Sequence, residues 1–460
     1  MSEPRQIPLA VGVSEKDVSG NESLINVVPK KTDGGKYPFT LIGTPGTPFF
    51  LELPTYPVLQ QFKSKGRSFA VTPTKLYEVF TDGTYAELGT VDLQGIRVNM
   101  ESNGLQLVMV DGIKGFYYDF AGMTITEFSG GGWYPAATVS YLDGYFIFDR
   151  VDTGQFFISD LNSITLDPLN IATAEGQPDN LVACVVDHRE AFMFGTDTIE
   201  FWYNSGDPDF PLERNQGAFV EKGCAARYTI AKQNNTIYFV GSDRRVYRMD
   251  GYWPVPISNK QVEATLNDVD LSDAFAYAYE EEGQLYYILT IPKSNVTWSY
   301  DTDLNQWSIR QSFQFGRHVG NCVSEFEGLT LIGDFQNGRI YDFSNKYYQD
   351  DQDPIVREFI LPTVFSGRSF FDINSLELDM SSGIGTNIGQ GKNPTALLSY
   401  SKDAGKTWSE WKEASIGMQG QYLTRVKWNR FGTGRSFDFK VRISDPIPID
   451  IGGAWIETGR

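Results

Sequence analysis

The stretch LVMVDGIKGFYYDF, residues 107–120, carries the pattern that decides the fold. An apolar run leads into the turn pair Asp111-Gly112, and an aromatic-rich run, GFYYDF (115–120), follows. Asp-Gly favours tight hairpin turns because such turns need positive φ, which these residues tolerate. The stretch therefore predicts short strands joined by a tight turn.

The aromatic-rich run recurs along the chain, in a loose repeat of apolar strand, turn pair, second strand, polar loop and third strand. Its copies are KLYEVF (75–80), GFYYDF (115–120), QFFISD (155–160), TIEFWY (198–203), RVYRMD (245–250), VTWSYD (296–301) and RIYDFS (339–344). Turn pairs accompany them at Asp82-Gly83, Asp111-Gly112, Asp143-Gly144, Glu282-Gly283, Glu327-Gly328 and Asn337-Gly338. Successive copies are 40, 40, 43, 47, 51 and 43 residues apart. A unit of this size with three or four short strands is a propeller blade, which needs neighbours on both faces. We expect an all-β fold with a β-propeller of six or seven blades, some irregular, over about residues 56–362.

The rest of the chain departs from this repeat. Residues 258–279 place Val262, Leu266 and Val269 at helical spacing, with Ser258 or Asn259 available as a cap, which predicts a short helix at about 259–267. The acidic segment 346–356 predicts a boundary, and residues 363–460 alternate as a C-terminal β-sandwich. In that segment Phe437, Phe439, Val441 and Ile443 should face the core, and Asp438, Lys440 and Arg442 the solvent.

The first 55 residues are rich in proline and show little alternation. They predict an extended N-terminal arm that lies on another surface and includes a ring-closing strand.

Composition limits the function. The chain has 460 residues and carries −19 formal charges, so tight DNA binding through Lys and Arg is not expected. Cys184, Cys224 and Cys322 are far apart in apolar runs and predict buried free thiols. No signal peptide or membrane span is predicted, so we expect synthesis in a reducing cytoplasm.

A motif similar to the Asp box of sialidases lies in LLSYSKDAGKTWSEW, residues 397–411. Asp403 should accept hydrogen bonds from turn amides, Gly405 should supply an unusual backbone angle, and Trp408 should pack under the hairpin. A sialidase repeats the box within its blades, whereas this copy lies outside the repeat region. The motif therefore predicts a well-made turn and not a hydrolytic site.

No other pattern marks chemistry. Glu200 is a candidate glycosidase carboxylate by its position alone, and an exposed strand position is the simpler interpretation. The two histidines, His188 and His318, lie 130 residues apart, and His and Cys lack metal-site spacing. Residues 350–353 (DDQD) lack the glycine and distal glutamate of a Ca²⁺ loop, and 129–133 (SGGGW) lacks the context of a phosphate loop. We expect no catalytic residue, no cofactor-binding residue, no metal ligand and no cofactor.

A basic cluster in the C-terminal region has two interpretations. It is the wet face of the sandwich, or a patch for an acidic protein partner. Its members are Arg425, Lys427, Arg430, Arg435, Lys440 and Arg442.

Taken together, the chain resembles the packaged-DNA-stabilising tail accessory (tail nozzle) proteins of short-tailed, Salmonella-type bacteriophages. The resemblance extends over nearly all the chain, and the order of its blocks carries it. The blocks are RQIPLAVGV (5–13), LINVVP (24–29), AEGQPDNLV (174–182), FGTDTIEFWYNSG (194–206), EKGCAARYTIA (221–231), 258–292 and WNRFGTGRSFDFKVRISDPIPIDIGGAWI (428–456). Residues 60–130 match only in pattern, and the motif at 401–408 is fuller than the family's.

The resemblance implies a virion structural protein. Such a protein forms a homo-hexameric ring below the portal-adaptor (head-to-tail) ring, narrows the DNA exit channel, retains packaged DNA and conducts it during ejection. Its partners are tailspikes or tail fibres, a tail needle or tip plug, and genomic double-stranded DNA passing non-specifically. Six copies at −19 each give −114, and an acidic lumen lets DNA pass without sticking. Two alternatives stay open: a carbohydrate-active propeller (glycosidase or glycan-binding module), and a cytoplasmic scaffolding propeller.

Overall fold

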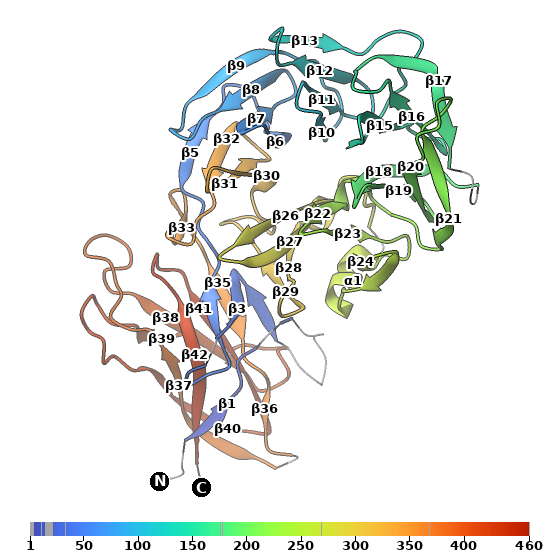
Figure 1. The fold of residues 1–460 in the computed structure, drawn as a ribbon. Helices are drawn as coiled ribbons and strands as arrows, with labels where there is room; N and C mark the ends of the chain where they lie inside the picture. The colour runs from blue at the N-terminus through green and yellow to red at the C-terminus, as the bar shows by residue number, and fades with distance from the viewer. Residues whose placement is uncertain are drawn as a thin grey trace.

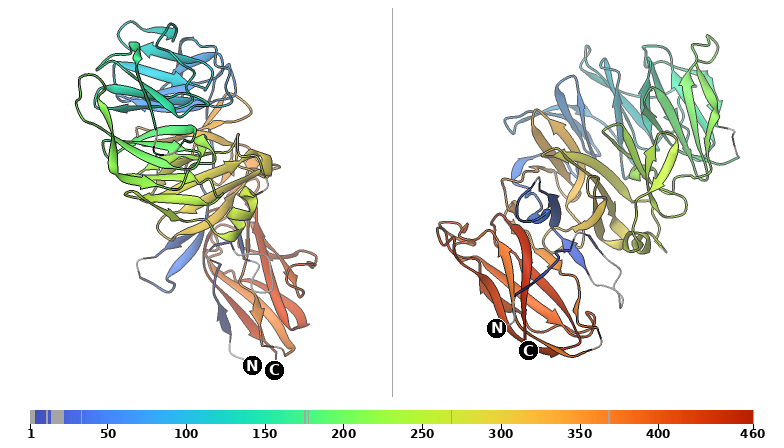
Figure 2. Two further views of the ribbon diagram at one scale, coloured as in Figure 1. Left: turned by 90° about the vertical axis from the view of Figure 1, so that its right-hand side faces the viewer. Right: turned by 60° about the horizontal axis from the view of Figure 1, so that its bottom comes forward.

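The computed structural model describes residues 4–10, 12–13, 22–32, 34–174, 176, 178–267, 269–367 and 369–459. Its blades follow one another round a ring, and a two-sheet sandwich packs beside the ring, with both chain termini at the sandwich's far end (Figure 1). Figure 2 shows the same two parts from the side and from below. No helix in the described residues is long and apolar enough to cross a membrane.

The described residues form seven blades of four antiparallel strands each, so the upper of the two expected blade numbers is correct. The first three blades are β6 (Gln60–Ser64), β7 (Arg67–Val71), β8 (Lys75–Val79) and β9 (Tyr85–Thr90); β10 (Asn99–Ser102), β11 (Gln106–Val110), β12 (Gly115–Asp119) and β13 (Thr124–Glu127); and β14 (Val139–Leu142), β15 (Tyr145–Asp149), β16 (Gln155–Ser159) and β17 (Leu166–Thr173). The next three are β18 (Leu181–Asp187), β19 (Glu190–Gly195), β20 (Ile199–Asn204) and β21 (Leu212–Val220); β22 (Ala231–Gln233), β23 (Thr236–Val240), β24 (Val246–Asp250) and β25 (Trp253–Pro256); and β26 (Phe275–Glu281), β27 (Gln284–Ile291), β28 (Val296–Asp301) and β29 (Gln306–Arg310).

The seventh blade closes the ring with a strand from the chain's N-terminal region. Its first three strands are β30 (Gly320–Phe326), β31 (Leu329–Asp334) and β32 (Arg339–Asp342), and its outer strand is β5 (Phe49–Glu52). Ile340 of β32 pairs with Leu51 of β5, and β30 contacts β6 of the first blade. The two ends of the repeat region are thus held together by strand pairing and by packing.

Each of the seven aromatic-rich runs is the third strand of a blade, as the repeat predicted. Their side chains pack between neighbouring blades: the rings of Phe156 in the third blade and Trp202 in the fourth, for example, meet edge to face with centroids 4.9 Å apart. The expected positive φ occurs at Asp143, Glu282 and Glu327.

At Asn337-Gly338 the expectation of positive φ is wrong, since neither residue is among those with positive φ. Gly338 is required there for a different reason: a Cβ would lie 2.1 Å from the Leu53 carbonyl oxygen, just after the ring-closing strand.

The helix between blades is α1 (Lys260–Leu266), as predicted. Asn259 caps it, because its side-chain oxygen accepts a hydrogen bond of 2.9 Å from the backbone N–H of Val262. Val262 and Leu266 are fully buried. Short 3₁₀ turns occur at η1 (Arg227–Thr229) and η2 (Pro292–Ser294).

The sandwich consists of two sheets. One has the order β3 (Val27–Lys31), β4 (Phe39–Gly43), β42 (Asp450–Thr458), β37 (Phe371–Met380) and β40 (Val426–Gly434), with β1 (Arg5–Ile7) also on β42. The other has the order β2 (Ser23–Ile25), β35 (Arg357–Ile360), β41 (Ser436–Ile443), β38 (Thr395–Ser401) and β39 (Lys412–Ser415), with β36 (Val364–Phe365) also on β41. The hairpin of β33 (Gln349–Asp350) and β34 (Asp353–Pro354) lies in the chain between the seventh blade and β35.

The core between these sheets includes Phe437, Phe439, Val441 and Ile443, so the predicted buried face of this strand is confirmed. The expectation for Asp438 is wrong, since it is 1% exposed. Thr363 covers it and donates a hydrogen bond of 2.5 Å to its carboxylate.

A parallel bridge between Ile25 and Ile309 joins β2 to β29, so the sixth blade and the second sandwich sheet form one continuous ten-stranded sheet. Five short strands lie within the described part of residues 1–55: β1 to β4 belong to the sandwich, β2 pairs in addition with the sixth blade, and β5 pairs with the seventh. The division of the chain at 55/56 and 362/363 stays a prediction.

Candidate functional site

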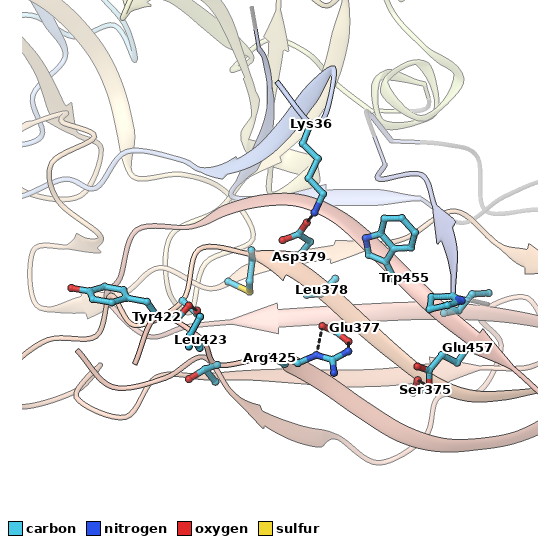
Figure 3. Close-up of a pocket in the computed structure, with 15 residues that line it drawn as sticks. Lys36, Ser375, Glu377, Leu378, Asp379, Tyr422, Leu423, Arg425, Trp455 and Glu457 are labelled. Atoms are coloured by element: carbon cyan, nitrogen blue, oxygen red, sulfur yellow. Dashed lines mark hydrogen bonds and ion pairs between the residues drawn. The ribbon is translucent and has the colours of Figure 1, made fainter. Parts of the chain in front are cut away.

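The sandwich carries a pocket of about 480 Å³ on the outer face of its first sheet (Figure 3). Strands β37 and β42 form its floor, and the 418–425 loop and the tip of the β3–β4 hairpin form its walls. Period-two alternation along β37 explains the lining: Leu376 points into the core, whereas Glu377 and Asp379 point outwards.

Charges in this pocket are paired with one another. The Arg425 Nε donates to Glu377 Oε1 at 2.7 Å, and Lys427 Nζ lies 3.1 Å from Glu457 Oε2. Lys36 donates to Asp379, and hydrogen bonds from Lys36 and Tyr37 lower the pKa of that carboxyl. A carboxylate whose pKa is lowered, as that of Asp379 is, stays ionised and is poorly suited to proton transfer.

One wall of the pocket continues into an apolar surface patch, which we call the 418–423 patch and define as Met418, Tyr422 and Leu423. These side chains are 42%, 70% and 96% exposed. The turn that carries them is fixed, because Gln421 N donates to Met418 O and Ser382 Oγ donates to Tyr422 O, both at 2.9 Å. Adjacent exposed apolar side chains on an ordered turn are typical of a protein contact surface.

The basic cluster is largely neutralised within the sandwich. Arg442 Nη2 lies 2.7 Å from Glu358 Oε2, and Lys440 Nζ lies 3.8 Å from the other oxygen of the same carboxylate. With Arg425 and Lys427 paired as described above, four of the six cations have internal partners. Arg430 and Arg435 are exposed. This arrangement favours the wet-face interpretation over a patch for an acidic partner.

The Asp-box-like segment forms the predicted turn between β38 and β39. Asp403 accepts hydrogen bonds from the Thr407 backbone N–H at 2.8 Å and from the Thr407 hydroxyl at 2.6 Å. These bonds lower the pKa of Asp403 to about 2. Gly405 has φ +76°, and Trp408 Nε1 donates to Gly405 O at 3.1 Å. Since both carboxylate oxygens of Asp403 accept bonds from the turn, the segment is built as a turn.

Glu200 corrects the expectation of an exposed strand position, because it is 2% exposed. Trp202 Nε1 donates to Glu200 Oε2 at 3.1 Å, the Gly176 N–H donates to the other oxygen, and Arg214 Nη1 lies at 3.5 Å. Sequence reasoning missed this because Arg214 comes from the next strand, and nothing local to TIEFWY reveals a counter-charge.

The histidines lie in different settings. His188 sits in the exposed turn between β18 and β19, 2.8 Å from Asp187. His318 is buried, and its Nδ1 accepts a hydrogen bond of 3.0 Å from Gly320 N. Burial, with a smaller effect from Arg310, lowers the pKa of His318 to about 3. The structure does not bring the two together.

The three cysteines are free and buried, as predicted. Burial raises the pKa of Cys224 to about 12 and that of Cys322 to about 11, and it raises the pKa of Cys184 still further. Thiols of this kind are inert at neutral pH.

The acidic and glycine-rich segments have structural partners. Asp350 accepts a hydrogen bond of 2.8 Å from Thr47, and Asp351 lies 3.2 Å from Arg339. In 129–133, Trp133 stacks on Phe128 with centroids 4.8 Å apart. Within the described residues, no group of three or more His, Cys, Asp or Glu side chains is arranged to hold a metal ion.

These observations define the class: a seven-bladed β-propeller joined to a β-sandwich, with paired charges and an exposed apolar patch. The chain belongs to the bacteriophage P22 Gp10 family of phage tail nozzle, or DNA-stabilising, proteins. The family's β-propeller model matches residues 5–348, and its β-sandwich model matches residues 356–459.

Solved structures are similar in fold only. They include the designed Ika8 protein (10% identity, 65% of this chain, 100% of that chain, TM-score 0.40), BamB from Moraxella catarrhalis (11%, 70%, 98%, 0.41) and the Neurospora crassa Pan2 WD40 domain (8%, 66%, 97%, 0.42). Likeness at this level carries no argument about what this chain does. No curated protein matches the sequence significantly.

Proposed function

We propose that the chain is a non-enzymatic subunit of a hexameric tail nozzle. The ring docks below the portal-adaptor ring, narrows the DNA exit channel, retains the packaged DNA and conducts it during ejection. The observation that carries this proposal is the match of both family models, in order, over nearly the whole chain.

Charge supports the proposed passage of DNA. The chain carries −19 formal charges, and the sandwich cations Arg425, Lys427 and Arg442 are occupied by Glu377, Glu457 and Glu358. Binding to DNA gains free energy when free Lys and Arg displace counterions from phosphates. A wall of this composition would let DNA slide and would not hold it by sequence or charge.

The 418–423 patch supports assembly. Closed rings form from head-to-tail interfaces between unlike surfaces of identical subunits. Leu423 is 96% exposed, so it does not stabilise the fold of the isolated chain. Burial of such a side chain between subunits would contribute about 1.5–3 kcal/mol to the free energy of association. The proposed partners are other copies of this chain, the adaptor ring, tailspikes or fibres, and the needle or tip plug.

The role is tested with phage that carry a nonsense mutation in this gene. We expect mass spectrometry of purified wild-type virions to find the chain at six copies per tail, and mutant particles to lose their DNA. Mutant particles that keep their DNA and infect would overturn the proposal. Turnover or binding of a bacterial surface glycan on an array would favour the carbohydrate-active alternative.

A further inference from the structure

A polar pocket of about 390 Å³ lies at the axis of the ring. Residues of the innermost strand of every blade line it: β6, β10, β14, β18, β22, β26 and β30. Figure 1 shows these strands facing the centre of the ring. In propellers the axis is where side chains from all blades converge, so a few polar groups there can act on one small ligand.

Arg97 projects into this pocket without a carboxylate partner in the described residues. Its Nη1 and Nη2 donate to the backbone oxygen and the side-chain oxygen of Asn321 at 3.0 and 2.7 Å, and its guanidinium lies 3.2 Å from the centroid of the Phe275 ring. Burial lowers the pKa of Arg97 to about 9. Arg97 is half-buried, and a partly desolvated cation that lacks a counter-charge costs the fold free energy that a bound anion would offset.

Arg227, on η1, offers a second guanidinium with unused donors. Its nearest carboxylate is that of Asp149, at 3.6 Å, and its side chain makes no hydrogen bond within the described residues. Asp149 is fully buried, and one of its oxygens already accepts bonds from the backbone of Ala137 and Thr138. Arg227 is therefore held near Asp149, while most of its guanidinium N–H groups stay free to donate hydrogen bonds to an oxyanion.

Tyr228 follows Arg227 in the chain and lines the same pocket as Arg97 and Arg227. Burial raises the pKa of Tyr228 to about 12; the positive charges of Arg227 and Arg97 oppose this rise, and the carboxylates of Asp149 and Asp111 add to it. Within the described part of the chain this hydroxyl has no hydrogen-bond partner, and Tyr228 lines the pocket. A phenol O–H is a good donor to an oxyanion.

The other charged groups of the pocket do not cancel this excess. Lys232 is paired with Asp187 at 2.8 Å, as Arg227 is with Asp149. Glu101 also lines the pocket, and burial raises its pKa to about 7, so part of it is neutral at physiological pH. Arg97 is thus the cation that remains uncompensated.

We propose that the axial pocket binds a small oxyanion, a carboxylate or a phosphate, between Arg97, Arg227 and Tyr228. This site goes beyond the nozzle role, because it is complete within one chain and requires neither the ring nor DNA. Bidentate guanidinium pairing and a tyrosine hydroxyl are the recognition chemistry that carboxylates and phosphates share.

The test is calorimetric titration of the full chain with citrate and with inorganic phosphate, against sodium chloride at equal ionic strength. We expect saturable binding of at least one oxyanion and none of chloride. Arg227→Lys and Tyr228→Phe should each weaken binding about fivefold or more, because each removes donors to a charged group. Arg435→Lys and Tyr422→Phe, the same changes on the exposed sandwich surface, should leave it unaltered.

Thermal unfolding separates specific binding from general salt effects, since phosphate and citrate stabilise most proteins by exclusion. Binding predicts a smaller midpoint increase in Tyr228→Phe than in Tyr422→Phe at equal oxyanion concentration. If Arg227→Lys fails to fold, Tyr228→Phe decides alone. Equal affinity in Tyr228→Phe and the wild-type chain, or no oxyanion binding at millimolar concentrations, would overturn the proposal and leave the nozzle role untouched.

Discussion

Asn26 and Gln311 exchange hydrogen bonds: Asn26 Nδ2 donates to Gln311 O at 2.7 Å, and Gln311 N donates to Asn26 Oδ1 at 2.9 Å. The same Nδ2 also donates to Val356 O at 3.0 Å, on the segment that enters the sandwich. Asn26 is 3% exposed and has φ +54°. One side chain therefore ties the end of the sixth blade to the start of the sandwich, beside the bridge of Ile25 and Ile309.

Replacing this residue should weaken the junction between the two parts. Asn26→Ala leaves the Gln311 N–H and two carbonyls unpaired in a buried site, at about 1–3 kcal/mol for each group, and puts alanine in a left-handed conformation that asparagine tolerates better. We expect a loss of at least about 2 kcal/mol in urea unfolding. Asn215→Ala, which removes two exposed hydrogen bonds, serves as the control; a loss for Asn26→Ala no larger than the control's would contradict the role of the junction.

Closure of the ring depends on the apolar face of β5. Leu51 is 3% exposed and packs with Val58, Tyr77 and Ile340, so Leu51→Ala should cost about 2–5 kcal/mol of unfolding free energy. Glu52→Ala, on the next residue and facing solvent, should cost less than about 0.5 kcal/mol. Denaturant unfolding of both variants measures the difference, and equal stabilities would show that β5 does not hold the ring closed.

Local sequence pattern was sufficient to predict the blades of the propeller and insufficient to predict the strands that join the propeller to the sandwich. GFYYDF and the similar runs predict third strands, because aromatic residues between turns fill the space between blades. This requirement can be read from a few consecutive residues. Strand β2, by contrast, has three residues, and its partners Ile309 and Phe359 lie roughly 300 residues away, so no pattern within 23–25 identifies it. Its conformation is set by pairing with β29 and β35, and tertiary contacts override weak local preference.

The candidate site shows the same division. The turn at Asp403 was predictable because its hydrogen bonds stay within seven residues, from Ser401 to Thr407. The lack of a carboxylate partner for Arg97 was not predictable, because it depends on which side chains of the seven inner strands face the axis of the ring. Glu200 was misjudged for the same reason: its counter-charge, Arg214, comes from a neighbouring strand.

Buried His318 should make the fold sensitive to acid. Its pKa in the fold is about 3, below the ordinary value of 6.5, so between these values the unfolded chain binds a proton that the folded chain does not. The contribution is complete above pH 6.5 and is lost as the pH falls towards 3. At pH 5 the loss is on the order of 2 kcal/mol relative to pH 7.

Urea unfolding at pH 7 and pH 5 measures this sensitivity. His318→Gln, which keeps an acceptor for Gly320 N, should reduce the difference between the two pH values by about that amount, whereas His188→Gln, at the exposed histidine, should not. An unchanged pH dependence in His318→Gln would mean that the acid sensitivity arises elsewhere.

The 418–423 patch should matter for assembly and not for folding. Leu423 is 96% exposed, so Leu423→Ser should change the unfolding free energy of the chain by less than about 0.5 kcal/mol. If the patch is buried between subunits of the proposed ring, the loss of about 1.5–3 kcal/mol per contact should weaken assembly at least tenfold.

Leu169→Ser, at an 83% exposed leucine on the outer strand β17 of the third blade, is the matched control. Sedimentation of the purified chain and its recovery in virions measure assembly. If Leu169→Ser reduces assembly and Leu423→Ser does not, the subunit contact lies at the rim of the propeller and not on the sandwich.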